Sequence, residues 1–214
     1  MNPKRLAIAS IVILLVVPSY AANPFLNAGD DKPVSAKFRG TEWSEDIGDK
    51  EIPLAAQVKT TRVAKMPWGA IFKIEFTDVK WREPQNGKIG PDYFVVTDDR
   101  IVLLNACPIH TGVLTLREIE EDNDCAVKKI SAMDKPPEFD PYDIYGITTG
   151  SFEHQQGLWK MTINLKGDLC TYHASHPSGH FKKVAWKKGV GLVEYASNYG
   201  AGREGYRLKR ITNR

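Results

Sequence analysis

Residues 179–210 read GHFKKVAWKKGVGLVEYASNYGAGREGYRLKR, and this stretch decides the fold. Apolar and basic residues alternate over 183–187, and Lys188-Gly189 offers a turn. The alternation resumes over 193–195 and, after a glycine-rich loop, over 206–209. A period of two indicates strands that are buried on one face. The stretch therefore predicts three consecutive antiparallel strands.

Further strands are predicted upstream by the same alternation. Residues 70–77 and 159–165 alternate strictly, and residues 93–97 and 101–104 form a hairpin around Asp98-Asp99-Arg100. Residues 147–152 and 169–173 extend the second half into a meander. The predicted core residues of this meander are Trp159, Met161, Ile163, Leu165, Trp186 and Tyr206.

The predicted fold class is mainly β, with α+β as the alternative. A single curved antiparallel sheet needs a second layer to cover its apolar face. The sheet supplies that layer by curling into a sandwich or half-barrel, or a short helix near residues 52–63 covers the concave face. Residues 52–66 fit either a helix or an extended piece.

The beginning of the chain is typical of a secretory signal peptide. Basic residues over 1–5 precede an apolar run over 6–17, and small residues precede a cleavage site after Ala21. An uncleaved anchor is the alternative, although the run is short for a membrane span. We expect a signal peptide over 1–21, an exposed N-terminal segment over 22–50 and one β-rich domain over 51–214, located in the periplasm or secreted. Within the N-terminal segment, residues 34–38 alternate and could be a first strand.

The three cysteines suit an oxidising compartment. A disulfide between Cys107 and Cys125 would close a loop, and Cys170 would remain as a buried free thiol. The net charge of +3 is small, with acidic residues over 118–124 and basic residues at the C-terminal end. We interpret the acidic run as a solvated connection and the basic residues as solvated strand faces. Weak contact with an anionic membrane or polysaccharide is the alternative, and export argues against a nucleic-acid partner.

Two motifs suggest ligand chemistry. Gly200–Gly205 has the GxGxxG spacing of a nucleotide loop, but residues 206–209 read as a strand where that loop needs a helix. We therefore expect no nucleotide cofactor. His173, His176 and His180 lie close in sequence and could hold Zn²⁺ or Cu²⁺, because neutral imidazoles bind both metals.

The pattern W-x-K-G-x-G-L-V-x-Y over residues 186–195, followed by Tyr199-Gly200-Ala201-Gly202, resembles the ends of several uncharacterised secreted bacterial envelope proteins. The Gly-Val-Gly-Leu-Val piece also resembles terminal hairpins of curved-sheet envelope proteins of the lipoprotein-carrier type. The resemblance covers the C-terminal stretch alone and carries no catalytic residues. It implies a β-rich envelope fold.

The first functional hypothesis is a non-enzymatic, exported binding or accessory protein. Its concave sheet face would present Phe72, Phe76, Trp159 and Trp186 to a partner protein or a small apolar ligand. The alternative is that these four residues are core. A metal-binding protein or metal-dependent hydrolase using the three histidines is the rival, and an inhibitor or immunity protein for a cell-wall enzyme is a third hypothesis.

Overall fold

The computed structural model describes residues 23–26, 32–45, 48, 50–79, 89–104, 116–200 and 204–212. The predicted signal peptide over 1–21 and Cys107 lie outside these residues. The signal peptide and the Cys107–Cys125 disulfide therefore stay predictions.

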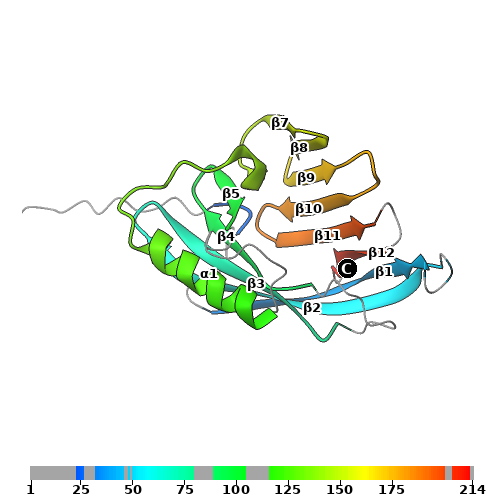
Figure 1. Ribbon diagram of the computed structural model, residues 1–214. Coiled ribbons are helices and arrows are strands. Elements are labelled where there is room, and N and C mark those ends of the chain that lie inside the picture. Colours follow the sequence, from blue (N-terminus) through cyan, green and yellow to red (C-terminus); the bar gives the residue numbers. More distant parts are fainter. Residues whose placement is uncertain are drawn as a thin grey trace, which may run out of the picture.

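The described residues form twelve strands, one α-helix and one short 3-10 helix (Figure 1). The strands are β1 (Val34–Ser44), β2 (Ile52–Met66), β3 (Gly69–Thr77), β4 (Asp92–Val96), β5 (Arg100–Leu103), β6 (Ile144–Ile147), β7 (Ser151–Gln156), β8 (Trp159–Lys166), β9 (Leu169–Ser175), β10 (Phe181–Lys187), β11 (Gly191–Tyr199) and β12 (Glu204–Arg210). The helix α1 spans Leu116–Ser131, and the 3-10 helix spans Pro141–Asp143.

All twelve strands belong to one antiparallel sheet, in the order β6-β5-β4-β3-β2-β1-β12-β11-β10-β9-β8-β7. Strands β1 to β6 form a first meander and β7 to β12 form a second. The two meanders join where β1 pairs with β12. The predicted fold class is confirmed: a mainly β protein with a single curved antiparallel sheet and one helix.

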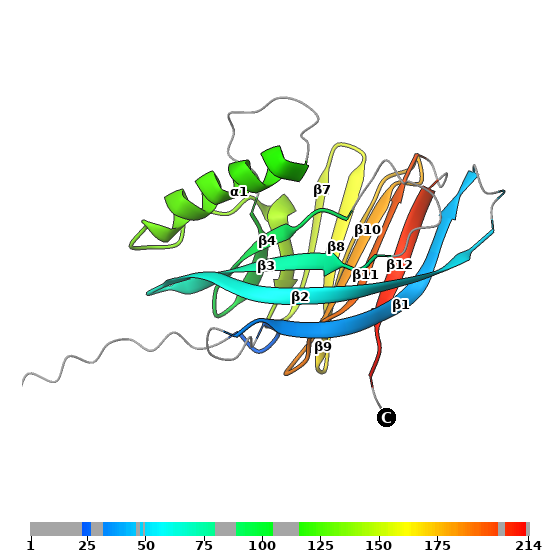
Figure 2. The ribbon, with the colours of Figure 1, turned by 90° about the horizontal axis from the view of Figure 1, so that it is seen from below.

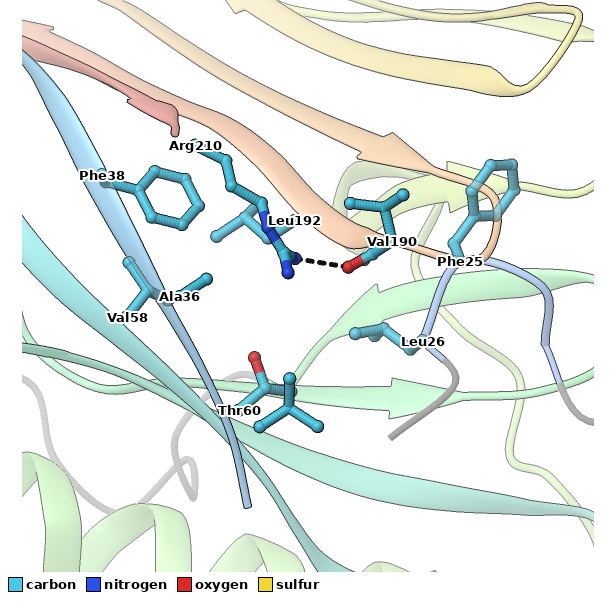
Figure 3. Close-up of a pocket in the computed structure, with 11 residues that line it drawn as sticks. Phe25, Leu26, Ala36, Phe38, Val58, Thr60, Val190, Leu192 and Arg210 are labelled. Carbon is cyan, nitrogen blue, oxygen red and sulfur yellow. Dashed lines mark hydrogen bonds between the residues drawn. The ribbon is translucent and has the colours of Figure 1, made fainter. Parts of the chain in front are cut away.

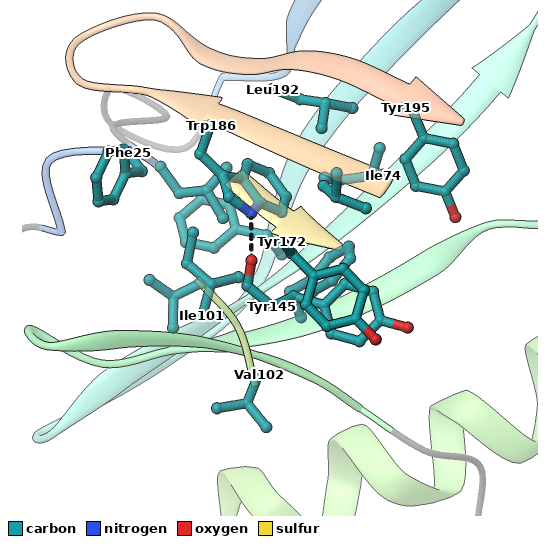
Figure 4. Packing of buried hydrophobic residues seen from close by; sticks show 14 of the residues in the cluster. Phe25, Ile74, Ile101, Val102, Tyr145, Tyr172, Trp186, Leu192 and Tyr195 are labelled. Carbon is teal, nitrogen blue, oxygen red and sulfur yellow. Dashed lines mark hydrogen bonds between the residues drawn. The ribbon is translucent and has the colours of Figure 1, made fainter. Parts of the chain in front are cut away.

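The sheet provides its own second layer by curling. The edge strand β6 lies against β8 and β9, so the inner faces of the two meanders meet. At the centre, Trp186 donates its indole N–H to the carbonyl of Tyr145 at 2.8 Å, and its ring meets Phe94 edge-on with centroids 5.4 Å apart. Figure 4 shows Trp186 and Tyr145 joined by this hydrogen bond within the packed cluster, while Val102 points the other way, toward α1. Of the two predicted ways to cover the sheet, curling is the one that the structure uses.

The seam between the meanders corrects one sequence-based expectation. Residues 22–50 were expected to form an exposed segment, but β1 is the centre of the sheet, and Phe38 is buried. The apolar signal of this strand is weak because Gly40 occupies an inward position. A Cβ atom at Gly40 would lie 1.6 Å from the carbonyl oxygen of Arg207, so the close approach of β1 and β12 requires glycine there.

The helix lies elsewhere than expected. Residues 52–66 are strand β2, and the acidic run over 118–124 belongs to α1 instead of a solvated connection. This helix covers the outer face of the first meander (Figure 2), where Glu120 pairs with Lys73 at 3.1 Å. Its buried side carries Asp122 and Ala126, so the acidic run has one packed face and one face in solvent.

The connections between strands agree with their turn residues in most places. The hairpins around residues 98–99 and 188–190 and the strand over 206–209 are confirmed. The single strand expected over 147–152 is wrong. Strand β6 ends at Ile147 and β7 begins at Ser151, with Gly150 at a φ of +72° in the turn between them.

Among the described residues, none of the helices combines the length and the apolar character needed to cross a membrane.

Candidate functional site

The predicted aromatic lining divides between core and rim. Phe72, Phe76 and Trp186 are 4%, 9% and 0% exposed and belong to the hydrophobic core between the meanders. Trp159 is partly buried and lies at the start of β8, where its ring meets His176 with centroids 5.2 Å apart. Three of the four residues therefore fill the inner face, as the alternative interpretation of them as core residues predicts.

The three histidines are not brought together. His173 lies on the outer face of β9, beside Phe181, because it alternates with the buried Tyr172 and Ala174. Partial burial, together with the positive charge of Lys183, lowers the pKa of His173. His176 and His180 lie in the turn that follows β9. Within the described part of the chain, no three His, Cys, Asp or Glu side chains are grouped so that they could hold a metal ion.

An apolar pocket lies at one end of the inner face, across the seam between the meanders (Figure 3). Its cavity of about 30 Å³ is large enough for a few carbon atoms or one or two waters. It is lined by Phe25, Leu26, Val34, Ala36, Phe38, Val58, Thr60, Val190, Gly191, Leu192 and Arg210. Strands β1 and β2 supply one side, and the β10–β11 turn with residues 25–26 supplies the other.

The wall formed by residues 23–26 is held by hydrogen bonds. The Asn23 side-chain amide donates to the carbonyl of Thr97 at 2.9 Å, and its side-chain oxygen accepts from the Phe25 amide at 3.0 Å. The Gly189 amide donates to the carbonyl of Pro24 at 2.8 Å. Sequence reasoning missed Phe25 and Leu26 because two isolated apolar residues between polar ones carry no periodicity.

Arg210 is the one charged residue among the described residues that line the pocket. It shares the inward face of β12 with Tyr206 and Leu208, and its guanidinium donates to the carbonyl of Val190 (Figure 3). Among the described residues it forms no ion pair. Sequence reasoning placed Arg210 on a solvated face. The signal that could have found it is the register of β12, in which every second residue from Tyr206 points inward.

A cluster of buried tyrosines lies elsewhere on the inner face. The Tyr195 hydroxyl donates to the Asp92 carboxylate, and Lys182 lies 3.6 Å from that carboxylate. The Lys182 ammonium also lies over the rings of Tyr145 and Tyr195, at 5.1 and 5.3 Å from their centroids. Burial, followed by the nearby Asp92 charge, raises the pKa of Tyr145 and Tyr195. These phenols stay protonated at neutral pH, so the cluster is a packing element with paired charges.

Cys170 is free and buried, as its sequence context predicts. Burial raises the pKa of its thiol, which keeps it protonated and unreactive. The cysteine therefore contributes volume to the core and offers no nucleophile.

The chain matches no model of a known protein family and no curated protein.

Proposed function

We propose that the protein is an exported, non-enzymatic binding module whose ligand is a small amphiphile with an anionic head. The apolar pocket binds the hydrocarbon chain of the amphiphile, and Arg210 binds its anionic head. The observation that supports this proposal is the combination of an apolar cavity with a single cation that no carboxylate neutralises among the described residues.

The energetics favour a charged head over a neutral one. A partly buried guanidinium whose only described partner is a backbone carbonyl has donors left for a carboxylate or phosphate. The apolar walls contribute about 0.8 kcal/mol for each CH₂ group that they remove from water. The cavity encloses only a few carbon atoms of such a chain, so binding is expected to be weak.

Octanoate is the probe that tests the proposal. We expect the purified protein, expressed from the full chain, to bind octanoate in a calorimetric titration and to bind 1-octanol at least tenfold more weakly. The variant Arg210→Gln should lose this preference, while the neighbouring Lys209→Gln should keep it. Equal binding of octanoate and octanol, or no binding of either, would contradict the role of Arg210.

A second pair of variants tests the cavity. Ala36→Phe places a ring in the pocket and should abolish octanoate binding. Ala55→Phe adds the same ring at an exposed position of β2 and should leave binding within about twofold of the wild type. A similar loss in both variants would show that the pocket is not the site.

The other two hypotheses stay predictions. Among the described residues His173 is not grouped with His176 and His180, and metal analysis of the purified protein, with His176→Ala as the variant, would test the metal-binding alternative. The inhibitor or immunity role stays a prediction, and co-purification with a cell-wall enzyme would test it.

A further inference from the structure

Four rings from two strands and one turn form a continuous row, called here the aromatic row: Trp159, His176, His180 and Tyr199. Neighbouring rings are in contact, with centroids 5.2 Å apart for Trp159 and His176, 6.1 Å for His176 and His180, and 5.0 Å for His180 and Tyr199. The ring centroids of Trp159 and His180 also lie 6.3 Å apart. Trp159 begins β8, the two histidines lie in the β9–β10 turn, and Tyr199 ends β11.

The register places this row on the inner face, beyond the filled core. Trp159 lies two residues before the buried Met161, and His180 lies two residues before Lys182, so each shares an inward face. Tyr199 is 69% exposed, and the other three rings are partly exposed. Burial in the core therefore does not account for the row.

Hydrogen bonds fix the polar edges of the two histidines. The Ser178 amide lies 3.1 Å from His176 Nδ1, and the Ser178 hydroxyl lies 2.6 Å from the same nitrogen and 2.8 Å from His180 Nδ1. His176 Nδ1 must accept, so a neutral His176 carries its proton on Nε2. The Ser178 hydroxyl donates its one proton to His176 Nδ1, so it can only accept from His180 Nδ1. A neutral His180 then has a free lone pair on Nε2. The row thus offers one donor and one acceptor beside the rings.

Two lysines nearby are already paired, and Glu204, opposite Tyr199 in the register of β11 and β12, adds a negative charge that disfavours an anionic ligand. Lys160 pairs with Glu153 at 2.7 Å, and Lys182 lies between Asp92 and two tyrosine rings. None of the four rings of the row belongs to a residue with a permanent charge. This chemistry suits a neutral ligand with apolar faces and a polar edge.

We infer that the aromatic row is a binding surface for an uncharged oligosaccharide. A pyranose ring has C–H faces that pack on aromatic rings and hydroxyls at its edge that both donate and accept. Successive sugar rings would lie along the row, with hydroxyls bonding His176 Nε2 and His180 Nε2. Separate residues line the amphiphile pocket, so this site does not depend on the proposed function.

The test is a calorimetric titration of the full protein with cellotetraose and chitotetraose. We expect saturable binding of at least one tetrasaccharide, weakened about tenfold by Tyr199→Ala, because stacking on one ring accounts for an effect of about this size. Phe181→Ala is the matched control, since Phe181 follows His180 in the chain but contacts His173 on the outer face. This control should bind within about twofold of the wild type.

Three results would overturn the inference. They are the absence of binding to both sugars at millimolar concentration, an equal loss of binding in both variants, and sedimentation with neutral phosphatidylcholine vesicles that Tyr199→Ala abolishes while neither sugar binds. The last result would assign the row and the neighbouring Leu158, which is 65% exposed, to a lipid surface. Octanoate binding by Tyr199→Ala should equal that of the wild type, which separates this test from that of the pocket.

Discussion

The two meanders use the same antiparallel pairing but bury their strands differently. In the first, β3, β4 and β5 are buried along nearly every residue, because α1 covers their outer face and the second meander covers their inner face. In the second, β8 and β9 alternate between buried and exposed residues, because their outer face meets solvent. A single sheet thus contains strands of two kinds, and the position of one helix decides which kind each strand becomes.

This contrast explains why the inward-facing residues can be identified from the sequence in the second meander and not in the first. Residues 159–165 alternate so strictly that the strand and its inward face are both evident. Tyr93-Phe94-Val95-Val96 is apolar throughout, which identifies a buried strand but does not tell which residue faces the helix and which faces Trp186. The strands that α1 covers therefore lack the alternation of apolar and polar residues that the uncovered strands show.

A substitution at the seam that joins the meanders should reduce the stability of the fold the most. Gly40→Ala would place a Cβ atom 1.6 Å from the Arg207 carbonyl oxygen, so β1 and β12 would have to separate. We expect a loss of more than about 3 kcal/mol in the free energy of unfolding, measured by urea denaturation. Gly167→Ala is the control: nothing lies within 4 Å of its added Cβ, and its φ of +61° should cost only about 1–2 kcal/mol. Similar losses in the two variants would contradict the tight seam.

Uncovering the first meander should cost somewhat less. Ala126 is 6% exposed on the packed side of α1, and Ala126→Glu would bury a carboxylate or detach the helix. We expect a loss of about 2–4 kcal/mol and faster amide hydrogen exchange in β3 and β4. Lys128→Glu changes an exposed position of the same helix and should cost less than about 1 kcal/mol. Unchanged exchange in Ala126→Glu would show that α1 does not protect these strands.

The contact between the meanders should weaken at alkaline pH. Burial raises the pKa of Tyr145, Tyr172, Tyr195 and Tyr206 above the value of about 10 for an exposed tyrosine. The unfolded chain releases these protons first, so stability should hold below about pH 10 and fall as the pH rises above it. The slope is about 1.4 kcal/mol per pH unit for each tyrosine that ionises only in the unfolded chain.

Tyrosine absorbance at 295 nm and urea denaturation across pH 8 to 12 would follow this process. The buried phenols should ionise together with unfolding. Ionisation of Tyr145, Tyr172, Tyr195 and Tyr206 near pH 10 in the folded protein would rule out the protected cluster.

A residue on the solvent-exposed outer face of the second meander, His173, should have the smallest effect on stability. Partial burial and the charge of Lys183 lower the pKa of His173, so the unfolded chain binds its proton more readily. Stability is complete above about pH 6.5 and should decrease slightly as the pH falls below that value. His173→Gln should remove this decrease, as measured by urea denaturation at pH 7.5 and 5. A steeper decrease of the free energy of unfolding in the variant would show that folding does not lower the pKa of His173.

Local signals predicted most strands, and tertiary contacts decided the candidate sites. Residues 183–187 alternate and Lys188-Gly189 turns the chain, so that hairpin could be derived from the sequence. Phe25 and Arg210 look like an isolated apolar residue and a solvated cation in sequence. They meet in one pocket because β1 pairs with β12 and the β10–β11 turn meets residues 23–26. The same holds for His176 and Tyr199, which the β10–β11 hairpin brings to one end of the sheet.

By itself the sequence determined a mainly β chain, a C-terminal meander and the free, buried Cys170, because alternation and turn residues act over a few positions. The tertiary structure alone decided that β1 lies at the centre, that the acidic run over 118–124 forms a helix on the outer face, and that His173 lies apart from His176 and His180. These features depend on which distant strands pair and in which register. A shift of one residue in that register would turn every side chain to the opposite face.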